Sequence, residues 1–211
     1  MSTIRSEPTP AVAAEPGVAD PAPLGLAAFA MTTFVVSVFN ADLLPADLDA
    51  VVLPLALFYG GIAQLLAGMW EFRNRNVFGA TAFTSYGAFW LSYAAFVQFF
   101  HDELPPDTAH KAIGVFLLGW AIFTCYMLVA SLRVSAAVAL VFLLLAATFI
   151  LLCTGEYMDS TSVLKWGGYV GLATAAAAAY ASFAGVANAT WGRVILPVVP
   201  LAPRPRSVDA R

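Results

Sequence analysis

The side chains in this sequence that could do chemistry are uncharged hydrogen-bonding groups set inside long apolar runs. They concentrate in the first three runs and comprise Thr32, Thr33, Ser37, Asn40, Gln64, Thr81, Thr84, Ser85, Tyr86, Ser92, Thr124 and Thr148. No Asp, Glu, Lys or Arg falls near the middle of any run. Charged groups at membrane depth are typical of proton relays and ion pathways, so their absence argues against a charged relay.

Gln64 differs from the hydroxyl residues in the way its side chain can be satisfied. A lone Ser or Thr in a helix usually bonds a carbonyl of its own preceding turn, which is the expectation for Ser92, Thr124 and Thr148. A glutamine in a membrane helix has no such local partner, so it bonds across helices or faces a polar path. Both alternatives stay open for Gln64 from the residues alone.

None of these groups forms a set that would catalyse a reaction. Ser85 and Tyr86 have no His or Lys partner in their run to serve as a base. His101 and His110 fall in an acidic segment, and no Cys/His cluster has metal-ligand spacing. We therefore expect no enzyme activity, no metal, no cofactor and no nucleic-acid partner.

The elements that must position these groups are membrane-spanning helices. The chain of 211 residues is 61% hydrophobic and 11% charged, whereas a soluble domain usually has about 25% charged residues. Its uncharged runs approach or exceed the about 20 residues that a helix needs to cross a bilayer, and they cover 24–41, 50–70, 76–100, 112–132, 134–155 and 166–192. This pattern predicts an all-α integral membrane protein with six transmembrane helices.

The charges between the runs are sorted in a way that supports six spans. Eight of the ten basic residues fall on one side if six helices alternate, while the other side holds only Lys111 and Lys165 together with most of the acidic residues. The positive-inside rule then places both termini in the cytoplasm. Proline-rich, polar ends predict disordered tails at 1–19 and 197–211 around a transporter domain at 20–196.

Three motifs resemble those of the acetate uptake transporter family, also called the succinate–acetate permease group. The first is Asp20-Pro21-Ala22-Pro23-Leu24-Gly25-Leu26, followed by Met31-Thr32-Thr33. The second begins at Phe58-Tyr59-Gly60-Gly61-Ile62-Ala63-Gln64 and continues through Gly68, Glu71, Phe78-Gly79, Ser85-Tyr86-Gly87 and Phe89-Trp90. The third, weaker match is Gly119-Trp120 with Phe123-Thr124.

This resemblance implies a homo-hexamer in the cytoplasmic membrane, with a pathway in each subunit that imports acetate, and in some members succinate, with protons. It implies a narrow point lined by Phe29, Tyr86 and Leu145, the last placed only by counting along its helix. Polar groups expected along the pathway are Thr32, Thr33, Gln64, Thr84 and Ser85. The motif residues carried over are Asp20, Pro21, Pro23, Gly25, Gly60, Gly61 and Glu71.

The sequence departs from the family pattern at three positions near the expected cytoplasmic mouth. Asp20 stands where the family usually has Asn, and Arg75 and Val77 replace Gly and Thr. Other functions remain alternatives at this point: a passive channel for urea, amides or ammonia, a membrane-embedded enzyme, and a scaffold that carries no flux. Competition of labelled acetate uptake by urea or acetamide would separate the first from an acid transporter.

Overall fold

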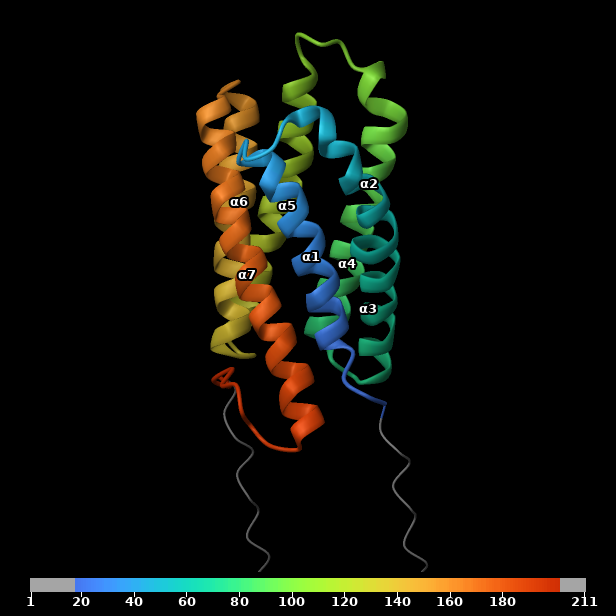
Figure 1. Cartoon of the computed structure of the whole chain (residues 1–211), viewed down its shortest axis with the longest axis vertical. Helices are drawn as coiled ribbons and strands as arrows, with labels where there is room; N and C mark the ends of the chain where they lie inside the picture. Colours follow the sequence, from blue (N-terminus) through green and yellow to red (C-terminus); the bar gives the residue numbers. More distant parts are fainter. Residues whose placement is uncertain (1–17, 202–211) are drawn as a thin grey trace, which may run out of the picture.

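The computed structural model describes residues 18–201, which form a bundle of long helices (Figure 1). Five helices are continuous, namely α1 (Ala22–Asn40), α4 (Val77–Ala95), α5 (Ala109–Ser131), α6 (Ala136–Tyr157) and α7 (Thr161–Trp191). A further span, covering Ala46–Arg73, joins four segments without a break: η1 (Ala46–Val51), α2 (Val52–Leu55), η2 (Ala56–Ala63) and α3 (Gln64–Arg73). Two short turns, η3 (Phe96–Phe100) and η4 (His101–Glu103), extend α4.

The prediction of an all-α membrane protein with six spans is confirmed. Within the described residues, all spans except α4 are long and apolar enough to cross a membrane by length and composition. The polar residues of α4, which include Thr81, Thr84 and Ser85, lower its apolar character. Because α4 buries one face against α3 and carries a row of buried aromatic residues, it belongs to the same bundle.

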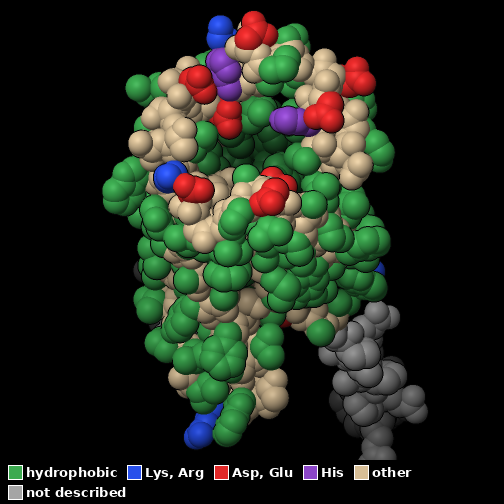
Figure 2. All heavy atoms as spheres, turned by 45° about the horizontal axis from the view of Figure 1, so that its top comes forward, with side chains coloured by type: hydrophobic (Ala, Val, Ile, Leu, Met, Phe, Trp, Pro, Cys, Tyr) green, Lys and Arg blue, Asp and Glu red, His purple; other side chains and the backbone are tan. Residues whose placement is uncertain are grey.

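The two ends of the bundle differ in charge. The described chain starts and finishes at one end, here called the terminal end, and the opposite end is the far end (Figure 1). Each described arginine lies at the end of a helix that finishes at the terminal end or just after it, and they are Arg73, Arg75, Arg133 and Arg193. Figure 2 shows the far end hollowed, with acidic and histidine side chains around the rim and hydrophobic side chains deeper inside. The helix order therefore sorts the charges as the sequence predicted.

Close backbone approach holds the helices together where glycines face a neighbour. A Cβ at residue 168 of α7 would overlap the backbone of Asn40 and Ala41, so α1 and α7 pack with no side chain between them there. A Cβ at residue 87 of α4 would lie 2.6 Å from the Leu65 nitrogen of α3. Small residues at such positions are the usual means by which membrane helices associate.

The α4–α5 pair is built differently. These two helices make few close backbone approaches, and large aromatic side chains fill the space between them. Phe89 of α4 stacks on Phe116 of α5 with centroids 5.8 Å apart, and its ring meets the edge of Trp120 at 5.0 Å. A wider, side-chain-filled interior on this side of the bundle is the region where the candidate site lies.

The departure at Arg75 has a structural consequence. Arg75 follows α3 with φ of 59°, a left-handed conformation that a glycine adopts without cost and that other residues adopt rarely. The family glycine at this position is therefore explained by the turn, and Arg75 occupies the same turn at some strain. At the other departure, Asp20 Oδ1 accepts from the Ala22 nitrogen at 2.9 Å. An asparagine oxygen could accept in the same way.

The residues after α7 return along the bundle as a strap. The nitrogens of Ala136 and Ala137 donate to the carbonyls of Val199 and Val198, at 2.8 and 3.2 Å, and Leu201 donates to Val134 at 3.1 Å. Val198, Val199 and Leu201 are thus hydrogen-bonded to residues at the start of α6, within a stretch for which the sequence predicted disorder. The rest of the predicted tails, 1–17 and 202–211, lies outside the described residues.

Candidate functional site

Two residues expected at the narrow point lie in direct ring contact inside the bundle. The centroids of Phe29 on α1 and Tyr86 on α4 are 5.8 Å apart, in a tilted arrangement. Leu145 on α6 belongs to the same cluster of buried residues. The three are 5%, 3% and 4% exposed, so the cluster is closed in this structure.

Tyr86 is the centre of this cluster. Phe123 of α5 meets its ring edge-on at 5.3 Å, and Trp120 of α5 and Phe142 of α6 lie at 6.0 and 6.1 Å. Aromatic side chains from α1, α5 and α6 therefore surround the phenol. The sequence motifs include Trp120 and Phe123 but give them no role, and Phe142 carries no sequence signal beyond its apolar run.

The Tyr86 hydroxyl has one polar partner. It lies 2.9 Å from Thr124 Oγ1 of α5, and the Thr124 hydroxyl also lies 2.7 Å from the Trp120 carbonyl of its own helix. The expectation that Thr124 bonds its own backbone is confirmed, but it misses the contact with Tyr86. That contact depends on how α4 and α5 are placed relative to each other, which residue spacing along one helix does not predict.

Several buried polar atoms in the described residues have no hydrogen-bond partner. They are Thr33 Oγ1, Gln64 Oε1, Glu71 Oε1, Thr84 Oγ1 and Trp90 Nε1. Leaving a buried polar group unpaired costs about 1–3 kcal/mol, so native proteins seldom keep several without a reason. Three of the five, Thr33, Gln64 and Thr84, are residues that the sequence predicts along the pathway.

Gln64 lies near the level of the aromatic cluster. A Cβ at residue 60 would lie 2.6 Å from Thr32 Oγ1, so α1 and η2 touch at that height. Gln64 comes about one turn after residue 60, and Phe29 comes about one turn before Thr32. The helices α1 and α3 run in opposite directions (Figure 1). Moving forward from residue 60 to Gln64 and moving back from Thr32 to Phe29 therefore both lead toward the terminal end. Gln64 and Phe29 are therefore brought to similar depth.

The wide turns of η2 immediately precede Gln64. This π-helical segment contains Gly60 and Gly61 and passes directly into α3. π-turns inside helices are rare and frequent at functional sites. Sequence periodicity does not show this turn, because η2 is apolar on all sides and has no polar face whose rotation could be followed.

The other expected pathway residues differ in how they are satisfied. Thr32 is fully buried, and its hydroxyl donates to the Ala28 carbonyl at 2.9 Å. Thr84 is half-buried and faces Gly68, where a Cβ would overlap its backbone nitrogen. Ser85 is half-buried on α4. The structure gathers Thr32 and Gln64 on one side of the cluster.

Most of the motif residues lie near the terminal end, whereas Gly60 and Gly61 lie in η2. Pro21 is buried, and the Pro23 carbonyl accepts from the Ser182 hydroxyl of α7 at 2.6 Å. Gly25 faces the Phe83 ring, to which a Cβ would come within 2.6 Å. Glu71 is 1% exposed, and its Oε2 accepts from the Asn76 side chain at 3.1 Å. These residues close the packing of α1, α4 and α7 below the cluster.

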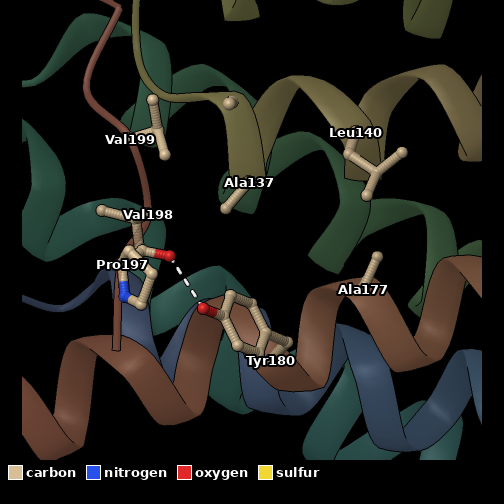
Figure 3. A pocket seen from close by; sticks show the side chains of 8 residues that line it. Ala137, Leu140, Ala177, Tyr180, Pro197, Val198 and Val199 are labelled. Atoms are coloured by element: carbon tan, nitrogen blue, oxygen red, sulfur yellow. Dashed lines mark hydrogen bonds between the residues drawn. The ribbon is translucent and has the colours of Figure 1, made fainter. Parts of the chain in front are cut away.

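Two surface depressions lie away from the aromatic cluster. One, of about 340 Å³, lies between the strap and the first turns of α6, and the Tyr180 hydroxyl donates across it to the Pro197 carbonyl at 2.8 Å (Figure 3). Another, of about 550 Å³, follows α1 and α7 past Met31, Phe34 and Phe183. Both are lined almost entirely by apolar side chains, so neither offers groups that would bind an acid.

No candidate metal site is present in residues 18–201, where no group of three or more His, Cys, Asp or Glu side chains could hold an ion. The described basic residues also lie at the two ends of the bundle, so the cluster has no cation beside it. The site is therefore a buried, uncharged aromatic cluster with unpaired polar atoms nearby.

Comparison with known proteins places this architecture in a family. The profile of the GPR1/FUN34/yaaH family matches residues 4–203. This chain belongs to that family. The Escherichia coli member named succinate-acetate/proton symporter SatP is 37% identical over 181 residues, covering 86% of this chain and 95% of its own length. The family resemblance seen in the sequence motifs is confirmed.

A solved structure extends the agreement to the fold. The bacterial acetate channel SatP superposes with a TM-score of 0.80 at 37% identity, covering 86% of this chain and 99% of that one. The Saccharomyces cerevisiae member named ammonia transport outward protein 2 is 41% identical over 176 residues. This chain spans 62% of the length of the yeast relatives that it matches. The chain is thus a member of a family of transporters and channels, not of enzymes.

One variant separates a pathway role for Gln64 from a role in packing. Gln64→Leu keeps the volume and removes an oxygen that has no partner, so we expect an unchanged or higher melting temperature and uptake of the transported solute reduced at least tenfold. The melting temperature should not fall, because an unpaired buried acceptor costs about 1–3 kcal/mol of stability. Uptake should fall if the solute uses this oxygen on its way through the protein. Differential scanning fluorimetry and vesicle uptake measure the two effects.

The matched control is Gln98→Leu, which makes the same change at an exposed position of η3. It should leave both the melting temperature and the uptake close to those of the unchanged protein. A Gln64→Leu protein that melts earlier yet transports normally would show that Gln64 serves packing.

Proposed function

We propose that this chain carries acetate, and other small carboxylates such as succinate, across the cytoplasmic membrane as the neutral acid, so that net transport resembles proton symport. The observation that carries this proposal is the buried cluster of Phe29, Tyr86 and Leu145, with no basic residue of the described range 18–201 beside it. The names of the Escherichia coli relative and of the solved structure support the substrate class.

The uncharged cluster favours the neutral acid on energetic grounds. Moving a bare ion into low dielectric costs about 20 kcal/mol in the idealised limit and several kcal/mol after relaxation. Protonating a carboxylic acid of pKa about 4–5 at pH 7 costs only roughly 3–4 kcal/mol, at about 1.36 kcal/mol per pH unit. The protonated route is cheaper wherever the gate supplies no permanent positive charge. Acidic groups on the far rim (Figure 2) would repel the anion and leave the neutral acid unaffected.

The proposal also includes the orientation of the transporter in the membrane and its assembly into an oligomer. Arginines at the terminal end and acids at the far end match an orientation with both termini in the cytoplasm. Large exposed apolar side chains, among them Phe34, Ile122 and Phe183, suit contact with lipid or with further copies of the chain. We extend this to a homo-hexamer with one pathway in each subunit.

A second candidate function is a passive channel for ammonia or other small neutral solutes. The yeast relative named for ammonia transport, at 41% identity, specifically favours it. The uncharged gate itself would pass either a neutral acid or a neutral amine.

Uptake by the reconstituted full chain decides between the two. Labelled succinate and acetate should enter proteoliposomes faster than protein-free vesicles, and excess urea or acetamide should compete little. Succinate is included because its neutral form leaks less through lipid than acetic acid does. Uptake equal to that of protein-free vesicles would exclude acid transport. Full competition by the neutral solutes would favour a channel that does not select for acids.

A further inference from the structure

Thr124 and Tyr86 form a hydrogen-bond chain whose direction can be read from atom types. Thr124 is fully buried, and its single hydroxyl group lies 2.9 Å from the Tyr86 hydroxyl and 2.7 Å from the Trp120 carbonyl. A carbonyl oxygen only accepts, so the one Thr124 proton goes to Trp120. The contact between the two hydroxyls then requires a second proton, and only Tyr86 can supply it.

This direction fixes what the Tyr86 oxygen offers to anything else. A phenol has one proton to donate and can also accept. When the Tyr86 proton is donated to Thr124, the Tyr86 oxygen can act toward any other group only as a hydrogen-bond acceptor. A solute that meets this oxygen must bring a hydrogen of its own.

We propose that Thr124 is a positioning residue that holds the Tyr86 hydroxyl as an acceptor, so that the gate selects protonated carboxylic acids and rejects carboxylates. The inference rests on the proposed function and names the group that discriminates between the two forms of the substrate. A neutral acid donates its O–H to Tyr86, whereas a carboxylate has no proton and would place its oxygens against the phenol lone pairs.

Other unpaired groups near the cluster do not supply this discrimination by themselves. The Gln64 oxygen is an acceptor without a partner, but the amide of the same side chain also has N–H donors that suit a carboxylate. The Trp90 indole N–H, 3% exposed and without a partner, can donate to the carbonyl oxygen of an acid and to a carboxylate equally well. The hydroxyls of Thr33 and Thr84 can donate or accept as the solute requires. Within the described residues near the gate, Tyr86 is the hydroxyl whose proton is held by a side chain of another helix.

The test is the pH profile of uptake by the reconstituted full chain. Thr124→Val keeps the shape of the side chain and removes the acceptor, which frees the Tyr86 proton to point into the gate. Initial rates of labelled acetate and succinate uptake are measured between pH 5 and pH 8, with equal pH on both sides of the vesicle. We expect the ratio of the rate at pH 5 to the rate at pH 7 to fall at least tenfold in the valine variant.

Three further variants keep the result interpretable. Thr124→Ser retains an acceptor and should restore the original ratio. Thr148→Val makes the same change at a buried threonine that bonds the Leu144 carbonyl and Thr174, away from Tyr86, and should also keep the original ratio. If the valine variant does not fold, Thr124→Ala removes the same acceptor atom in a smaller side chain.

The outcomes separate this inference from the function on which it rests. A folded, transporting Thr124→Val or Thr124→Ala protein with the unchanged pH ratio would overturn the role of Thr124 while leaving acid transport intact. Absence of uptake by the unchanged protein, in the same vesicles, would instead remove the proposed function. A changed ratio in Thr148→Val as well would show a general packing effect and would also overturn the inference.

Discussion

Protein-dependent uptake of acetate should fall roughly 50- to 100-fold between pH 5 and pH 7 at constant total acetate, as the fraction of neutral acid falls for a pKa of about 4–5. The sign follows from the titration of the substrate: raising the pH through and above its pKa removes the proton, and the closed uncharged cluster then excludes the anion. Stopped-flow or filter uptake at symmetrical pH, with a series of total concentrations, measures the slope.

The leak of acetic acid through lipid must be separated from the protein's contribution. Protein-free vesicles of the same lipid provide the background at each pH, and succinate, which leaks less, provides a second substrate. Rates that follow the concentration of ionised acetate, or that stay constant across this pH range, would contradict passage of the neutral acid.

Shortening Leu145 should widen the range of transported acids. Leu145→Ala removes buried atoms from the cluster beside Tyr86, and we expect the ratio of lactate to acetate uptake to rise at least tenfold. The same change should lower the stability by about 2–5 kcal/mol, because a buried leucine leaves a cavity when it is truncated. Phe29→Ala should widen the range in the same direction.

Each of these variants has a neighbour on the same helix that makes a matched control. Leu143 is 54% exposed on α6, two residues before Leu145, and Phe34 is 53% exposed on α1, five residues after Phe29. Leu143→Ala and Phe34→Ala should keep the original preference for acetate over lactate. Equal preferences in all four variants would take Phe29 and Leu145 out of the filter.

Local patterns were sufficient for the elements of this fold. The uncharged runs predicted each span to within a few residues, and the sorting of Arg and Lys predicted which helix ends lie together. This works because lipid requires every backbone group to be satisfied within its own helix, so length and charge alone define a span. The weakest case is α4, whose Thr and Ser residues lower its apolar character although it is an integral part of the bundle.

Side-chain partners across helices could not be predicted in the same way. For Thr124 the sequence offered only a bond to its own helix, and the structure adds the contact with Tyr86 on α4. For Gln64 two alternatives were open, and its oxygen is found without a partner. The hydrogen-bonded strap at residues 197–201 likewise depends on the position of α6, which lies some sixty residues earlier in the chain.

The sequence by itself determined that this chain crosses a membrane with six helices, which ends carry which charge, and to which family its motifs belong, because these properties are set by residue type and spacing along one helix at a time. Only the tertiary structure decided that Phe29 meets Tyr86, that the Tyr86 hydroxyl contacts Thr124, and that the Gln64 oxygen lies unpaired at a similar depth to Phe29. Those facts depend on the rotation and depth of each helix against its neighbours. In a membrane, close packing at small residues fixes both.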